Sequence, residues 1–169
     1  MGWARLVVGL LATIGLGLWA TGAGAVESDP LPVPKGGSRE RAVIAYNAGV
    51  KLLLDKKYAD AQTKFEEALA ADEQLAEAHN NLAFSLRMQS PANRALALKH
   101  YDRALDLKPD LAQAYMYRGV LFTQMGDLDR ARADHARLLK LDRALATKLE
   151  RVIAGEGRDE KEGVASQYE

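Results

Sequence analysis

The chain contains no cysteine among its 169 residues. This absence excludes disulfide bonds, thiolate metal sites, cysteine nucleophiles and a lipid-modified N-terminal cysteine. An excess of charge of one sign is missing as well, because 23 basic residues balance 23 acidic residues. A nucleic-acid partner is therefore not expected, since such partners are usually bound by a basic surface. With 48% hydrophobic residues, the chain can nevertheless bury a substantial core.

Catalytic and metal-binding patterns are also lacking. The three histidines, His79, His100 and His135, do not pair at helical spacing, and no acidic residue completes a metal set with them. We expect His79 and His135 to pack in the core and His100 to be exposed. The acidic stretch that begins at Asp127 lacks the glycine and the terminal glutamate of a calcium loop. No serine stands in a Gly-x-Ser-x-Gly turn. We therefore predict a protein that is not an enzyme and holds no metal or cofactor.

A long hydrophobic run occurs only at the N-terminus. Residues 6–20 carry no charge, follow Arg5, and lead to the small residues Ala-Gly-Ala at 23–25. This layout predicts a secretory signal peptide over residues 1–25, cleaved between Ala25 and Val26. The alternative is an uncleaved anchor, because about 20 apolar residues can span a bilayer. We expect export to the periplasm, with anchoring in the inner membrane as the alternative.

Proline and glycine are concentrated outside the central part of the chain. Residues 26–38 hold three of the five prolines and a Gly-Gly pair, which predicts an extended linker outside the core. Residues 155–169 are charged and lack apolar periodicity, so we expect a disordered tail. Between them, residues 39–154 are rich in helix formers, and apolar residues recur every three or four positions. This pattern predicts six helices and a seventh near residues 143–154.

Small residues recur at fixed distances along this helical part. One set steps by 34 and then 36 residues and consists of Gly49, Ala83 and Gly119. A second set steps by 36 and then 34 residues and consists of Ala61, Ala97 and Ala131. The reversed order places two additional residues inside the second unit, and we assign them to the segment 89–93 because loops accept insertions cheaply. We predict repeats at about 42–75, 76–111 and 112–145, followed by a capping helix at 146–154.

The residue types at these positions have a physical reason. The small residues allow two helices to approach closely, Phe65 and Tyr101 fill the space between neighbouring hairpins, and Pro109 ends the second hairpin. The capping helix has one apolar face, made by Leu145, Leu149, Val152 and Ile153.

With these residues in this order, the chain resembles tetratricopeptide repeat (TPR) proteins. The third repeat matches best, through Tyr115, Gly119, Phe122, Gly126, Leu128, Ala131 and Leu139. Four positions depart from the family pattern. Arg118 stands where an apolar residue is usual, His135 replaces an aromatic residue, and Glu73 and Arg143 replace prolines. The resemblance implies an all-α fold: a right-handed superhelix of three helix hairpins plus a C-terminal capping helix.

The resemblance also implies a function, because such proteins hold a peptide or a helix of a partner in a concave groove lined by the first helix of each hairpin. The groove candidates are Tyr46, Asn47, Val50, Asn80, Asn81, Phe84, Arg87, Met116, Tyr117, Val120 and Gln124. Aromatic, Met and Arg side chains are typical interface anchors, and asparagine amides can pair with a peptide backbone. The alternative is that some of these aromatics pack between repeats.

A basic clamp for a partner's terminal carboxylate is not expected. Asn81 matches one member of that family cluster, but its Lys and Arg members are absent, and Tyr46 and Val50 stand in the first repeat. We therefore expect a non-catalytic interaction module of the cell envelope with an unidentified protein or peptide partner. The alternatives are a self-associating homo-oligomer and, if the N-terminal segment is not cleaved, a membrane-anchored assembly factor.

Overall fold

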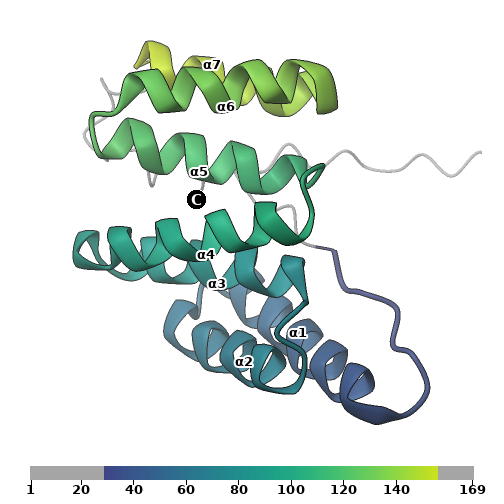
Figure 1. Ribbon diagram of the computed structural model, residues 1–169. Coiled ribbons are helices and arrows are strands. Elements are labelled where there is room, and N and C mark those ends of the chain that lie inside the picture. The colour runs from purple at the N-terminus through teal and green to yellow at the C-terminus, as the bar shows by residue number, and fades with distance from the viewer. Residues whose placement is uncertain (1–28, 156–169) are drawn as a thin grey trace, which may run out of the picture.

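The computed structural model describes residues 29–155, and this part of the chain is helical with no strand. Its elements are α1 (Gly37–Leu54), α2 (Tyr58–Ala71), α3 (Ala76–Gln89), the short 3-10 helix η1 (Pro91–Asn93), α4 (Arg94–Leu107), α5 (Ala112–Gln124), α6 (Leu128–Leu141) and α7 (Arg143–Ala154). The helices pair as α1–α2, α3–α4 and α5–α6, and α7 packs on both members of the last pair (Figure 1). The predicted all-α superhelix of three hairpins with a capping helix is confirmed. The predicted signal peptide, its cleavage site at Ala25 and Val26, and the tail from residue 156 lie outside the described residues.

Two of the three hairpin turns use the same backbone conformation. Lys56 has φ 57° in the first hairpin, and Gly126 has φ 80° at the corresponding place in the third. Glycine adopts this left-handed conformation without steric cost, whereas lysine does not. The second hairpin differs because it carries the additional residues. These form η1, in which the Ser90 hydroxyl accepts a hydrogen bond from the Ala92 N–H, and the predicted insertion site in the segment 89–93 is confirmed.

The small residues are found at the tightest helix contacts. A Cβ atom added to Gly49 would lie 2.6 Å from the ring of Phe65, which is fully buried on α2. In the third hairpin the same position behaves differently. A Cβ atom on Gly119 would lie 2.5 Å from Leu149 of α7, and His135 is only partly buried. The capping helix therefore supplies the large apolar side chain that α6 lacks.

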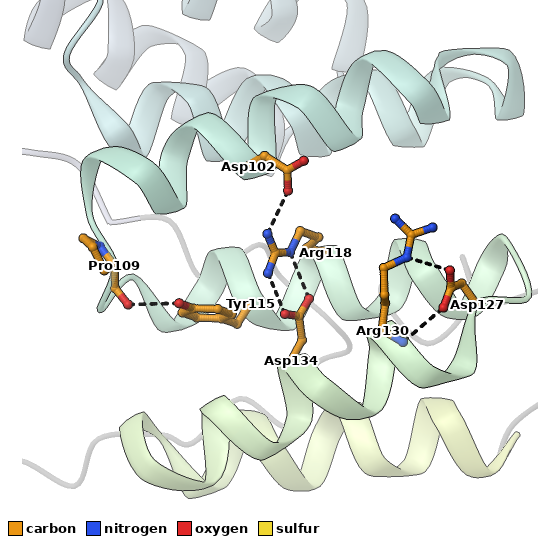
Figure 2. Close-up of polar contacts among 7 residues, drawn as sticks. All are labelled: Asp102, Pro109, Tyr115, Arg118, Asp127, Arg130 and Asp134. Atoms are coloured by element: carbon orange, nitrogen blue, oxygen red, sulfur yellow. Dashed lines mark hydrogen bonds and ion pairs between the residues drawn. The ribbon is translucent and has the colours of Figure 1, made fainter.

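Arg118 is accommodated by carboxylates rather than by an apolar environment. Its Nε and Nη2 atoms donate to the two oxygens of Asp134 on α6, at 3.0 and 2.7 Å. Its Nη1 atom donates to Asp102 on α4 at 2.7 Å, so one guanidinium joins three helices (Figure 2). Burial opposes the charge of Arg118, but the hydrogen bonds to Asp134 and Asp102 outweigh it and raise the pKa of the guanidinium. This departure from the repeat pattern is thus a connection between neighbouring hairpins.

No helix among residues 29–155 is sufficiently long and apolar to cross a bilayer.

The contact at Gly49 gives a stability prediction. Gly49→Ala should lower the free energy of unfolding by about 1–3 kcal/mol, because Phe65 has no free space to move into. Without the clash, the same change inside a helix would stabilise the protein by about 0.5–1 kcal/mol. Urea unfolding followed by circular dichroism measures the difference. A second change, Phe65→Leu, should recover part of the loss in the Gly49→Ala background, and a raised urea midpoint for Gly49→Ala alone would contradict the assignment.

Candidate functional site

The predicted groove residues lie on α1, α3 and α5, the first helices of the three hairpins. Nine of the eleven are buried, and only Asn47 and Gln124 are partly exposed. Phe84 and Val120, for example, are 1% and 0% exposed. As they stand, these side chains form a packed layer rather than an open surface. Which of them contacts a partner stays a prediction.

The aromatic members of this layer pack against one another. Phe84 on α3 and Tyr117 on α5 meet edge to face with their ring centroids 5.0 Å apart. Tyr46 on α1 contacts Phe65 on α2 with a centroid separation of 5.7 Å. Aromatic pairs at such distances add stability beyond the area they bury. These contacts show aromatic residues packing between helices and between repeats, which is the alternative raised from the sequence.

A polar chain runs beside the aromatic layer. The amide of Asn80 donates to Asn81 Oδ1 at 3.0 Å, and Asn81 Nδ2 donates to the Tyr46 hydroxyl at 3.1 Å. Burial and the nearby Glu77 carboxylate raise the pKa of the Tyr46 phenol, so its hydroxyl stays protonated and can donate in turn. Buried amides in such a chain are fixed in orientation. The Oδ1 atom of Asn80 is buried without a hydrogen-bond partner, which leaves one acceptor unused.

A cavity of about 250 Å³ opens next to this polar chain. It is bounded by Tyr46 of α1, by Asn80, Asn81 and Glu77 of α3, and by Gln113 of α5. Lys108, which follows α4, closes one side and pairs with Glu77 at 3.0 Å. Sequence reasoning did not select Glu77 or Gln113. They lie 36 residues apart, so the repeat step places them at one position of neighbouring repeats and could have identified both.

Asp29 and Leu31 line this cavity, and the segment 29–36 runs on into the first turn of α1 (purple trace, Figure 1). Asn47 of α1 holds it by the main chain. Asn47 Oδ1 accepts from the Leu31 N–H at 2.7 Å, and Asn47 Nδ2 donates to the Leu31 carbonyl at 2.8 Å. The side chain of Leu31 packs against the hydrophobic core. The expectation that this linker stays outside the core is therefore wrong at Leu31, because a residue between two prolines still has an N–H and a carbonyl that need partners.

Arg87 of α3 has the opposite environment from Arg118. Only 7% of Arg87 is exposed, and its Nε and Nη2 atoms are buried without a hydrogen-bond acceptor. Its guanidinium lies 5.1 Å from the centre of the Phe84 ring, which offers a cation–π contact. Burial raises the pKa of the neighbouring Tyr101 phenol, and the positive charge of Arg87 and its contact with the phenol oxygen oppose that rise. Within the described residues, Arg87 is a buried cation without a salt bridge.

His79 is buried as predicted, but the prediction for His100 is wrong. His100 is half-buried rather than exposed, and its Nδ1 atom lies 3.0 Å from Nδ1 of His79. Because His79 Nε2 lies 3.1 Å from the Glu73 carbonyl, which can only accept, Nε2 carries the proton and Nδ1 of His79 accepts from His100. The two rings come from adjacent helices, 21 residues apart, so helical spacing could not reveal them. Residues 29–155 contain no group of three or more potential metal ligands.

The two arginines give opposite stability predictions. Arg87→Met should raise the free energy of unfolding by about 1 kcal/mol or more, because it removes buried donors that lack acceptors. Arg118→Met is the matched control and should lower it by about 3–5 kcal/mol, because Asp134 then stays buried without a cation. Chemical unfolding of both variants beside the wild type decides the point. A loss of stability for Arg87→Met as large as that for Arg118→Met would show that Arg87 is compensated after all.

The histidine pair predicts a pH dependence. Burial lowers the pKa of both His79 and His100 below the ordinary value of 6.5, with the nearby Arg103 adding to the effect at His79 and Glu66 and Glu73 opposing it. The folded protein therefore binds fewer protons than the unfolded chain, and stability should be full above pH 6.5 and fall as the pH drops below it. Urea midpoints between pH 7.5 and 5.5 measure this. His100→Gln should weaken the dependence of the urea midpoint on pH. An unchanged dependence would show that other titratable groups cause it.

Comparisons with known proteins bear on the fold. No protein-family model and no curated protein sequence matches the chain. Similar solved structures include the first TPR of Spaghetti (RPAP3) bound to the HSP90 peptide SRMEEVD, 24% identical with a TM-score of 0.63, covering 69% of this chain and 92% of that one. The Arabidopsis OM64 TPR domain is 19% identical with a TM-score of 0.65. The match covers 70% of this chain and 98% of that domain. The second TPR of RPAP3, bound to the same peptide, is 26% identical with a TM-score of 0.56. The match covers 61% of this chain and 94% of that domain. The chain thus has the fold of a tetratricopeptide-repeat domain.

Proposed function

We propose that this chain is a non-catalytic interaction module that holds an extended peptide segment of another protein along α1, α3 and α5. The observation that carries the proposal is the pair of hydrogen bonds between the Asn47 amide and the main chain of Leu31. In this contact, a side chain on the first helix of a repeat binds the main chain of an extended segment. Main-chain binding of this kind gives affinity without demanding one particular side chain.

The path of the peptide follows the cavity between the three helices. Asn81 occupies the position of Asn47 one repeat later, 34 residues along the chain. Asn80 adds an unused acceptor, and Gln113 adds an amide at the far side of the cavity. Amide groups with both donors and acceptors suit the alternating N–H and carbonyl groups of a peptide.

Two similar solved structures support a peptide ligand in general. Both RPAP3 domains are bound to an HSP90 peptide of sequence SRMEEVD. The present chain lacks the Lys and Arg residues that a clamp for a terminal carboxylate would need, since Tyr46 and Val50 stand in the first repeat. We therefore propose an internal, largely uncharged segment as the ligand rather than an acidic C-terminus.

We further propose that the protein acts in the cell envelope. This part of the proposal depends on the N-terminal sequence, with its uncharged run at 6–20 and the Ala-Gly-Ala site at 23–25. The intact mass of protein purified from its native cell separates the alternatives. A chain that starts at Val26 supports export and cleavage, and a full-length mass supports an inner-membrane anchor.

Blocking the cavity tests the binding proposal without removing a core side chain. Gln113→Trp should reduce the capture of partner protein from an envelope extract at least tenfold, about 1.4 kcal/mol, because the larger ring fills the cavity. Lys99→Trp on the exposed side of α4 is the matched control and should capture as the wild type does. Affinity capture followed by mass spectrometry measures both. Equal capture by Gln113→Trp and Lys99→Trp would place the binding surface elsewhere, provided that circular dichroism shows both variants to be folded.

A further inference from the structure

The segment held by Asn47 has a distinctive sequence, in which Leu31 stands between Pro30 and Pro32 and a further proline follows at 34. We propose that the face of α1 around Asn47 recognises an extended segment with one apolar residue between two prolines. We also propose that the chain's own Pro30-Leu31-Pro32 fills this site in competition with a partner segment of the same kind. The inference deepens the proposed function and rests on it.

The hydrogen bonds define which residue is recognised. Proline has no N–H group, so Leu31 is the one residue of the Pro-Leu-Pro triplet that can donate to Asn47 Oδ1. Its carbonyl accepts from Asn47 Nδ2 at 2.8 Å, so a single amide satisfies both main-chain groups of a single residue. The apolar side chain of Leu31 packs on the core while Val33 is exposed, which places the side-chain preference at Leu31.

The prolines explain how so few contacts can hold the segment. Each proline fixes its own φ, and a residue that precedes a proline is confined to extended conformations. Leu31 is therefore already extended before it meets Asn47, and little conformational entropy is lost on binding. A flexible segment that made the same two hydrogen bonds would lose more conformational entropy on binding. A ligand for this site should accordingly combine the apolar residue with prolines on both sides.

The same contacts make the site self-occupied. Both amide heavy atoms of Asn47 that can bind a main chain are used by Leu31, so a partner must first displace it. The segment is joined to α1 through Gly36 and Gly37, which have φ 80° and 82°. The surroundings of both glycines are open, and the one side-chain hydrogen bond at this joint runs from the Gly36 N–H to the Glu40 carboxylate of α1 at 2.8 Å, so the pair can act as a hinge with Gly36 as its fixed end. Because the segment is tethered, its effective concentration is of the order of millimolar.

Displacement would extend the open cavity. Asp29 and Leu31 form part of the wall of the 250 Å³ cavity, whose other residues come from α1, α3, α5 and the α4–α5 connection. The Tyr46 hydroxyl reaches the Asp29 carbonyl only at 3.5 Å, a long and weak contact. Release of the segment therefore loses two good hydrogen bonds and one half-buried leucine. A partner segment that binds Asn47 in its place can continue toward the unused Oδ1 atom of Asn80.

A labelled peptide with the sequence of residues 29–35, Asp-Pro-Leu-Pro-Val-Pro-Lys, tests the proposal by fluorescence polarisation on the full chain. The wild type should bind it weakly, because its own segment competes at an effective concentration in the millimolar range. Leu31→Asp weakens the internal segment and should bind the peptide at least about tenfold more tightly. Leu31→Asp combined with Asn47→Leu should show no binding. A peptide with Leu replaced by Asp is the matched control and should fail with every variant.

Three outcomes would overturn the inference. If Leu31→Asp does not bind the peptide, the face does not recognise the motif. If it binds no more tightly than the wild type, the internal segment does not compete. If binding survives Asn47→Leu, the amide is not the recognition group. Partner capture that remains sensitive to Gln113→Trp would leave the proposed function standing in each case, so the two failures are distinguishable. Circular dichroism, together with hydrogen exchange at the Leu31 amide, confirms that the variants fold and that the segment has been released.

Discussion

The close approach of paired helices at small residues is the constraint on which the rest of this structure depends. Ala61, Ala97 and Ala131 are completely buried on the second helices, and Gly49 and Gly119 leave no room for a methyl group. Interiors packed at this density tolerate little change in volume. Because a small residue stands at the same position of each hairpin, equivalent positions of α1, α3 and α5 come to lie beside one another. Asn47 and Asn81 thereby occupy the same position of neighbouring repeats.

Two arginines lie between these helices, and their surroundings differ. Arg118 takes the position of an apolar residue, and Asp102 and Asp134 on two other helices satisfy it (Figure 2). Arg87 is similarly buried but has an aromatic ring in place of a carboxylate. A charge removed from water is tolerated when hydrogen bonds replace its hydration and is costly when they do not. The first arginine therefore contributes to the cohesion of the repeats, whereas the second keeps two buried donors without an acceptor near the end of α3.

The repeat made most of the fold predictable from sequence. Distances of 34 and 36 residues between small residues define the hairpins, and their reversed order locates the insertion that forms η1. Contacts between residues that occupy no common repeat position could not be found in this way. His79 and His100 are such a pair, and so are Gly119 and Leu149. The periodicity also predicts which face of α3 carries Phe84. It does not predict which residues of other helices pack on that face.

The binding site was only partly predictable for a related reason. Asn47, Asn80 and Asn81 follow from their place on the first helices, but Leu31 lies in a segment whose proline content suggests a linker. Composition reports the stiffness of such a segment and says nothing about the hydrogen bonds that its remaining N–H groups must make. Glu77 and Gln113 could have been selected from the 36-residue step. Their polar character gave no separate signal, since charged and amide side chains are common on helix surfaces.

The packing of Leu149 against Gly119 has a consequence for the modularity of the protein. In arrays of identical units, any unit can be followed by another, and the number of units is free to change. Here the last hairpin relies on a leucine from the helix that comes next, because its own histidine does not fill the space. A further copy of the hairpin could be added after α6 only if its first helix carried an equivalent leucine. Gain or loss of a unit at this end would therefore need coordinated changes on both sides of the junction.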